Sequence, residues 1–305
     1  MEILDARETA KRLPYPALAA SIREVALAMG SDDLRAPPRF ALPLQEDGIL
    51  LVMPAADTEI AITKLVTVHP ENPARDLPTI QGEVVVMDAT TGGRLGLLEG
   101  RVVTARRTAA LSMLAARELA PRPDGPLLVV GAGTQGRAHL DAFREGLGVS
   151  RAFISSRSQG NAVSLAGHAR SLGMEAEAVE GPEEVLDDVG LIVTATTSKE
   201  PVLPESIPDN IFVAAVGAFE PEAAELSPAL ISASRVFVDT LEGVKEEAGD
   251  LIQAERVGAF AWENATELKA ALHSPERPEG TVVFKSVGHA LWDLAAARTA
   301  FLDPA

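Results

Sequence analysis

The sequence predicts an α/β protein in which a Rossmann-type, doubly wound parallel sheet is joined to a second, α+β domain with a largely antiparallel sheet. Three observations carry this prediction. Apolar strands alternate with helices over residues 126–254, a glycine motif follows the first of these strands, and residues 1–103 contain short alternating runs. Continuous apolar runs are typical of parallel strands buried on both faces, and alternation is typical of antiparallel strands with one wet face.

The first region begins with a helix and continues as strands. Apolar spacing predicts a helix over 17–29, and alternation predicts strands at GILLVMPA, EIAITKLVTV, GEVVVMDA and GRLGLLEG, with a hairpin turn at 88–94. The proline-rich pieces 37–43 and 70–78 are expected to be loops. Thr104 is expected to cap a long helix rich in Ala and Leu, which ends before PRPDGP.

The second region repeats a strand–helix unit. Its strands are expected at PLLVV, RAFIS, EAEAV, LIVTAT, NIFVAAV and RVFVD, with helices that include TQGRAHLDAFREGL and NAVSLAGHARSL. Such a repeat builds a doubly wound sheet. The tail, 281–301, is expected to form a short strand and a closing helix.

Composition narrows the function. The chain has 305 residues, 47% of them hydrophobic, and a net charge of −17, which disfavours binding to nucleic acid or an anionic membrane. It has no cysteine, and its five histidines are far apart, so no metal site is expected. The N-terminus has no apolar run of signal length, and no stretch reaches the ~20 apolar residues of a membrane span, so we expect a cytoplasmic protein.

LLVVGAGTQGRAHL contains G-x-G-x-x-G between a predicted strand and a predicted helix, the context in which this motif binds a dinucleotide. Gly131 would allow the tight turn, Gly133 the approach of a pyrophosphate, and Gly136 close packing of helix and strand. The helix N-terminus, with Thr134 and Gln135, would offer N–H groups to the phosphates. The alternative is a glycine-rich turn without a ligand.

The end of the second strand selects the cofactor. An NAD-binding loop has Asp or Glu there, ~20 residues after the motif. This chain has Ser155, Ser156, Arg157 and Ser158. A guanidinium and hydroxyls would bind a 2′-phosphate that a carboxylate would repel, which favours NADPH over NADH. In the alternative, Arg157 points into solvent and NAD binds through backbone contacts.

Two further strand ends are expected at the nicotinamide side. Thr194 and Thr196 belong to TATTS, and Val216 and Gly217 to AVGAF. Ligands of open α/β sheets bind at the carboxyl ends of strands. The small residues in these segments are equally compatible with packing alone.

Three cations in the first region are candidates for a substrate site. Arg39 follows two prolines, Lys64 lies inside an alternating strand, and Arg107 is near the start of a helix. A lysine inside a strand is usually on the wet face, so Lys64 is expected to be exposed. Arg107 would be easier to explain if it faced a bound anion, because the helix dipole disfavours a cation there.

The chain resembles the ornithine cyclodeaminase/μ-crystallin family over nearly its whole length. The resemblance rests on TKLVTVHPENP, RTAALSMLAARELA, VGAGTQGRAHL, AVGAFEPEAAEL and KSVGHALWDLAAA. It implies a homodimer with a substrate-binding and dimerisation domain over 1–117, completed by 281–305, and an NADP-binding Rossmann domain over 118–280. It also implies that Arg39, Lys64 and Arg107 hold a substrate carboxylate.

The sequence departs from the cyclodeaminases at one position. They carry an aspartate shortly after the A-V-G segment, and Phe219 stands in its place. A phenyl ring cannot transfer a proton, but it could keep a substrate pocket dry. The chain therefore resembles the members that reduce Δ1-pyrroline-2-carboxylate and Δ1-piperideine-2-carboxylate, with Lys64 as a candidate proton donor beside solvent or the substrate itself. An ornithine cyclodeaminase, an alanine-type dehydrogenase and a non-catalytic NADP-binding crystallin remain alternatives.

Overall fold

The computed structural model describes residues 1–274 and 276–302, and the chain divides into two compact units. Unit 1 comprises Met1–Arg107 and the C-terminal segment from His289, and unit 2 comprises Thr108–Gly288. These boundaries differ from the expected ones, 117/118 and 280/281. One reason is that α3 (Gly100–Leu119) continues from the first unit into the second, and another is that the strand at 282–285 belongs to the sheet of unit 2.

Unit 1 is built on a six-stranded sheet in the order β1-β6-β5-β4-β3-β2. The neighbours are antiparallel as expected, except that β1 pairs with β6 in parallel. The strands are β1 (Glu2–Leu4), β2 (Phe40–Pro43), β3 (Ile49–Ala56), β4 (Ile60–Val68), β5 (Ile80–Asp88) and β6 (Arg94–Glu99). The expectation of a loop over 37–43 is therefore wrong for 40–43, where Pro43 ends an edge strand that tolerates it.

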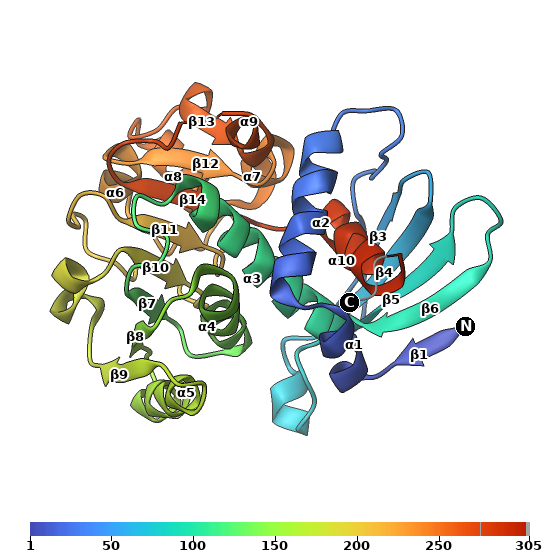
Figure 1. Ribbon diagram of the computed structural model, residues 1–305, viewed down its shortest axis with the longest axis horizontal. Coiled ribbons are helices and arrows are strands. Elements are labelled where there is room, and N and C mark those ends of the chain that lie inside the picture. The colour runs from blue at the N-terminus through green and yellow to red at the C-terminus, as the bar shows by residue number, and fades with distance from the viewer. Residues whose placement is uncertain (275, 303–305) are drawn as a thin grey trace. The chain divides into compact units, whose positions relative to one another are not determined.

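One face of this sheet is covered by helices. Along β4, Ile60, Ile62, Lys64 and Val66 are buried, while the intervening side chains face the other way. The C-terminal helix α10 (Ala290–Phe301) contacts β3, β4 and β5, and it also packs on α2 (Tyr15–Ala28) (Figure 1). The remaining helical segments of unit 1 are α1 (Ala6–Arg12) and the 3₁₀ turn η1 (Asn72–Arg75).

Local sequence explains two connections of unit 1. The predicted hairpin turn after Asp88 is confirmed, because the Asp88 carboxylate accepts hydrogen bonds from the backbone N–H groups of Thr90 and Thr91. The expectation that Thr104 caps the long helix is wrong, since α3 begins at Gly100. Glu99 caps its first turn by accepting from Val102 N at 2.8 Å, and the Thr104 hydroxyl donates to the Gly100 carbonyl.

Unit 2 has an eight-stranded sheet in the order β13-β12-β14-β11-β10-β7-β8-β9, and all of its pairs are parallel, as the apolar runs predicted. The strands are β7 (Leu127–Val130), β8 (Arg151–Ser155), β9 (Glu175–Val179), β10 (Leu191–Thr194), β11 (Phe212–Ala215), β12 (Arg235–Val238), β13 (Ala265–Glu267) and β14 (Val282–Lys285). The strand order reverses between β7 and β10, and ligands of such sheets bind at this point.

Helices connect the strands of unit 2. In Figure 1, α4 and α5 lie beside β7 to β9, in agreement with their contacts. The helical segments are α4 (Thr134–Leu147), α5 (Gln159–Ser171), α6 (Pro228–Ser232), α7 (Leu241–Glu247), α8 (Gly249–Arg256), α9 (Leu268–Leu272) and the 3₁₀ turns η2 (Pro182–Glu184), η3 (Leu186–Asp188) and η4 (Trp262–Asn264).

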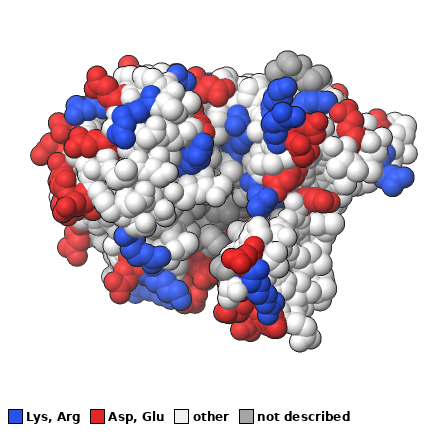
Figure 2. Space-filling view, turned by 90° about the horizontal axis from the view of Figure 1, so that it is seen from below, with Lys and Arg blue, Asp and Glu red and all other residues white. Residues whose placement is uncertain are grey.

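On the face drawn in Figure 2, groups of Asp and Glu are interspersed with groups of Lys and Arg. No helix within 1–274 or 276–302 has the length and apolar character needed to cross a membrane.

Candidate active site

The glycine loop between β7 and α4 needs each of its glycines for a different reason. Gly131 has φ +108°, and a Cβ there would lie 2.4 Å from the Ala195 carbonyl oxygen. A Cβ on Gly136 would lie 1.9 Å from the Gly131 carbonyl oxygen. Gly133 faces open space, because nothing lies within 4 Å of its ideal Cβ. This is the division into turn, approach and packing glycines that a dinucleotide loop uses.

The first turn of α4 is suited to a phosphate. Its N-cap is Gly133, which provides no side-chain hydrogen bond, so the N–H groups at Thr134, Gln135 and Gly136 lack a cap of this kind. Unpaired N–H groups and the helix dipole together favour an anion. The loop and helix end therefore fit a pyrophosphate, although the binding roles of these residues stay predictions.

A buried histidine holds this helix in place. His139 contacts the Gln135 carbonyl oxygen through Nδ1 (2.8 Å) and Ser112 Oγ of α3 through Nε2 (3.0 Å). Burial lowers the pKa of His139 to about 4, partly offset by the bond to Gln135. The neutral ring thus links α4 to α3 within unit 2.

A pocket of about 670 Å³ opens beside the glycine loop. Ser156, Arg157 and Ser158, from the connection between β8 and α5, line it, and Ser158 also caps α5. Arg157 is exposed. Among the described lining residues the one carboxylate is Glu180, which follows β9 and not β8. The position where an NAD-binding acid is expected is therefore occupied by donors.

The residues expected at the nicotinamide side divide into two groups. Thr196 lines the pocket. Thr194 is fully buried, Val216 donates its N–H to the Thr194 carbonyl at 3.0 Å, and Gly217 N donates to Glu225 at 2.7 Å. These three residues are absent from the described lining of the pocket, so direct contact with a cofactor is not supported for them. Sequence reasoning missed Glu225, which gave no signal beyond its place in the family motif.

Unit 1 contains a second candidate site around Lys64. The expectation that Lys64 is exposed is wrong, since only 3% of the residue is accessible. Lys64 lies on the inner face of β4, where Nζ donates to Oδ1 of the fully buried Asp293 on α10 at 3.0 Å. Sequence reasoning missed Asp293, because 229 residues separate the partners.

Further cations surround this ion pair. Arg107 Nε lies 3.5 Å from Asp293 Oδ1. Burial is the main cause that lowers the pKa of Lys64; Asp293 opposes the shift, and Arg107 and Arg39 add to it. In the described chain, Arg107 Nε and Asp293 Oδ2 are buried without a hydrogen-bond partner. The structure thus brings Arg39, Lys64 and Arg107 together, with polar atoms that a ligand could satisfy.

The neighbour of Arg107 on α3 has different partners. Arg106 packs over the Tyr15 ring at 3.8 Å and donates to the Leu13 carbonyl, so its neighbour Arg107 alone of the two pairs with Asp293. Phe219 lies in the loop after β11 and is 53% exposed. Its role in keeping a substrate dry stays a prediction.

Comparison with known proteins identifies the family of the chain. The model of the ornithine cyclodeaminase/mu-crystallin family matches residues 5–301. The chain is 36% identical to Delta(1)-pyrroline-2-carboxylate reductase 2 of Burkholderia ambifaria, over 97% of this chain and 94% of the relative. It is also 36% identical to the Delta(1)-pyrroline-2-carboxylate/Delta(1)-piperideine-2-carboxylate reductase of Azospirillum brasilense, over 98% and 94%. A solved structure, the Thermococcus litoralis Delta(1)-pyrroline-2-carboxylate reductase with NADH and L-proline, superposes with a TM-score of 0.91 at 28% identity, covering 99% and 97%.

Proposed function

Because the chain belongs to the ornithine cyclodeaminase/mu-crystallin family, we propose that it is a reductase of cyclic ketimines that uses a reduced nicotinamide cofactor. The substrates are Δ1-pyrroline-2-carboxylate and Δ1-piperideine-2-carboxylate, and the products are L-proline and L-pipecolate. The observation that carries the proposal is the buried cluster of Lys64, Arg107 and Asp293, in a chain that also has a dinucleotide loop and resembles named reductases of these imines.

NADPH is the proposed cofactor, with NADH as a weaker substitute. The α4 N-terminus would hold the pyrophosphate, and Arg157 with Ser156 and Ser158 would hold the 2′-phosphate. When bound, the reduced nicotinamide supplies a hydride to the imine carbon C2.

The cations of unit 1 would bind and orient the imino acid. A guanidinium and an ammonium, both little solvated, are strong partners for a carboxylate, and fixing the carboxylate fixes the neighbouring C2. The reaction also needs one proton at the imine nitrogen. Lys64 Nζ is the proposed donor, since burial and the two arginines lower its pKa and so make it release its proton more readily, while Asp293 opposes this shift.

A parallel assay tests the proposal. Purified protein is mixed with each imine and with NADPH or NADH, and the loss of absorbance of the reduced cofactor is followed. We expect turnover with at least one imine, faster with NADPH. Ammonia release from ornithine without net cofactor change would instead indicate a cyclodeaminase, and ammonia-dependent reduction of pyruvate an alanine-type dehydrogenase. Binding of the cofactor without turnover of any substrate would indicate a non-catalytic NADP-binding protein.

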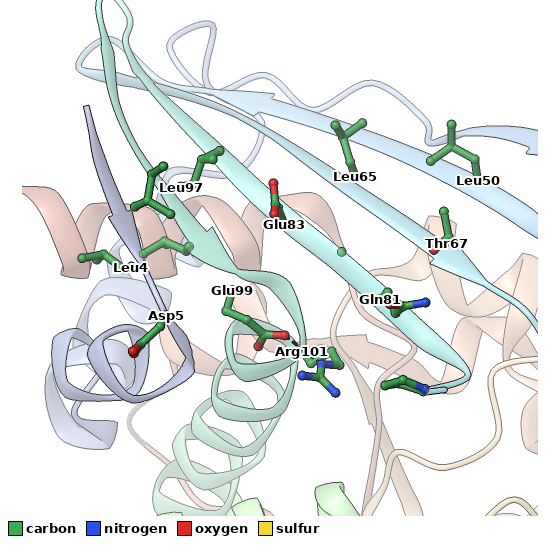
Figure 3. Close-up of a pocket in the computed structure, with 14 residues that line it drawn as sticks. Leu4, Asp5, Leu50, Leu65, Thr67, Gln81, Glu83, Leu97, Glu99 and Arg101 are labelled. Carbon is green, nitrogen blue, oxygen red and sulfur yellow. Dashed lines mark hydrogen bonds and ion pairs between the residues drawn. The ribbon is translucent and has the colours of Figure 1, made fainter. Parts of the chain in front are cut away.

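We also propose that the protein is a homodimer that pairs through the outer face of the unit 1 sheet. This face carries the side chains opposite to Lys64, and a pocket of about 550 Å³ lies on it (Figure 3). Leu50, Leu65 and Leu97 contribute apolar surface there, and Ile3 is 69% exposed. A second copy would remove this surface from water. Light scattering after size exclusion should show a dimer, and Leu65→Glu should shift it towards monomer; a monomeric wild-type protein would contradict the proposal.

A further inference from the structure

A buried carboxylate joins the two strand ends beside the dinucleotide pocket. Glu225 is completely inaccessible, and both of its oxygens are used. Oε1 accepts from Thr196 N (2.7 Å) and from the Thr196 hydroxyl (2.8 Å). Oε2 accepts from Gly217 N (2.7 Å) and from the Thr194 hydroxyl (3.0 Å). One side chain therefore connects the segment after β10 with the segment after β11.

An ion pair between Asp250 and Lys285 holds the backbone of the same loop. Asp250 Oδ1 accepts from the backbone N–H groups of Glu225 (2.6 Å) and Leu226 (2.8 Å). Lys285, the last residue of β14, lies 2.6 Å from Asp250 Oδ2 and donates to the Ala218 carbonyl at 2.6 Å. Lys285 and Asp250 are both fully buried. The charge of Lys285 therefore balances that of Asp250, although Asp250 Oδ2 has no hydrogen-bond partner in the described residues.

The packing around Glu225 leaves little freedom. A Cβ on Gly217 would lie 2.3 Å from the Thr196 carbonyl oxygen and 2.4 Å from Glu225 Oε1. The two loops therefore approach each other closely enough that only glycine fits. Burial, the largest cause, and the nearby Asp250 raise the pKa of Glu225, while Lys285 and the donors of Thr196 oppose them.

We infer that Glu225 is a positioning residue that fixes the segments after β10 and β11 against each other, and so preforms the surface for the nicotinamide half of a dinucleotide. The inference rests on the proposed function only in requiring a dinucleotide. The segment after β10 lines the pocket directly with Ala195, Thr196, Thr197 and Ser198. The adenosine end is expected at the end of β8, from which Glu225 receives no hydrogen bond in the described chain.

Glu225→Gln tests the inference, because an amide cannot replace the carboxylate in this position. Each carboxylate oxygen of Glu225 accepts from one backbone N–H, that of Thr196 or that of Gly217. In either orientation of the glutamine amide, its NH₂ group would face one of these N–H groups, so two donors would oppose each other. Glu222→Gln is the matched control, since Glu222 is exposed and three residues away. The probes are NADH and ADP, which has the adenosine and the pyrophosphate but lacks the nicotinamide riboside. Their dissociation constants are measured by calorimetry on the full chain.

We expect Glu225→Gln to weaken NADH ~10- to 100-fold, the value of a hydrogen bond to a charged group, and to change ADP affinity by less than about twofold. Glu222→Gln should match the wild type for both. Unchanged NADH affinity in Glu225→Gln would overturn the inference, and so would equal weakening of NADH and ADP, which a purely structural role predicts.

A second variant covers the case in which Glu225→Gln does not fold. Thr194→Val removes the hydroxyl that donates to Glu225, and Thr194 is not among the described residues of the pocket lining. This variant should weaken the binding of NADH but not that of ADP. If it binds NADH like the wild type, the inference is wrong. The test measures affinities and does not depend on turnover. A wild-type protein that binds NADH but reduces no imine would therefore contradict the proposed function, and the inference about Glu225 could still be tested.

Discussion

Replacing Arg157 by alanine should change the choice of cofactor without changing the ability to bind one. Arg157 lines the dinucleotide pocket from the connection between β8 and α5, and it is exposed. A 2′-phosphate distinguishes NADPH from NADH, and the guanidinium is the proposed partner of that phosphate. The variant should therefore lose NADPH affinity and keep NADH affinity.

The exposure of Arg157 sets the size of this effect. A hydrogen bond to a charged group contributes ~1.5–3 kcal/mol net, and water and salt screen an exposed pair, so the lower end of that range applies. This corresponds to a loss of roughly 10- to 30-fold in NADPH affinity. Any stacking of the guanidinium on adenine is common to both cofactors and cancels in the ratio of the two dissociation constants. Arg157→Asp should reduce the ratio further, because a carboxylate repels the phosphate.

Fluorescence titration with NADPH and NADH at low and at high salt measures this ratio. Arg144→Ala is the control, since Arg144 is an exposed arginine of α4 that is not among the residues described as lining the pocket. The wild-type preference for NADPH should shrink with salt, and that of Arg157→Ala should not. A wild-type protein that prefers NADH, or a ratio that is the same in Arg157→Ala, would refute the assignment of Arg157.

Three further predictions concern buried groups. Asp293→Asn removes the contribution that raises the pKa of Lys64, so the protonated donor is lost at lower pH. The alkaline limb of the pH–rate profile of kcat/KM should therefore move to lower pH, and an unmoved limb would exclude Lys64 as the donor. Arg107→Met should raise the KM for the imine at least about tenfold, whereas Arg106→Met should lower the melting temperature and leave KM unchanged; equal effects on KM would contradict the assignment. The pKa of His139 is about 4 in the folded protein and about 6.5 in the unfolded chain, so the unfolded state binds the proton more readily. The contribution of the neutral ring to the free energy of unfolding is therefore fully present above pH 6.5, and it falls by about 2 kcal/mol between pH 7 and pH 5. Urea unfolding at both pH values should show a smaller loss in His139→Gln.

The sequence predicted those parts of the protein whose cause is local. Continuous apolar runs predicted the parallel sheet, and the glycine spacing predicted the turn before α4, because strand burial and turn geometry depend on neighbouring residues. The first strand was missed, since three residues at a charged N-terminus carry no visible alternation. Pro43 hid the edge strand β2 for a similar reason.

The partners of the functional groups could not be predicted in the same way. Lys64 was expected in water, which is the normal place for a lysine in a strand, and only the return of α10 to β4 supplies the carboxylate that keeps it buried. Glu225 reaches donors 29 to 31 residues earlier, through a loop whose path the local sequence does not determine. Charged residues inside a fold are understood from their partners, and these partners come from distant segments.

Because inward and outward side chains alternate along β4, the position of Lys64 depends on the number of residues between it and the start of the strand. Deleting a single residue between Ile60 and Lys64 would turn the ammonium towards solvent and present Leu65 to α10, so Asp293 would be left as a buried charge opposite a hydrocarbon. Insertions or deletions in this strand should therefore abolish folding and activity together, while the loops at its two ends remain free to vary in length.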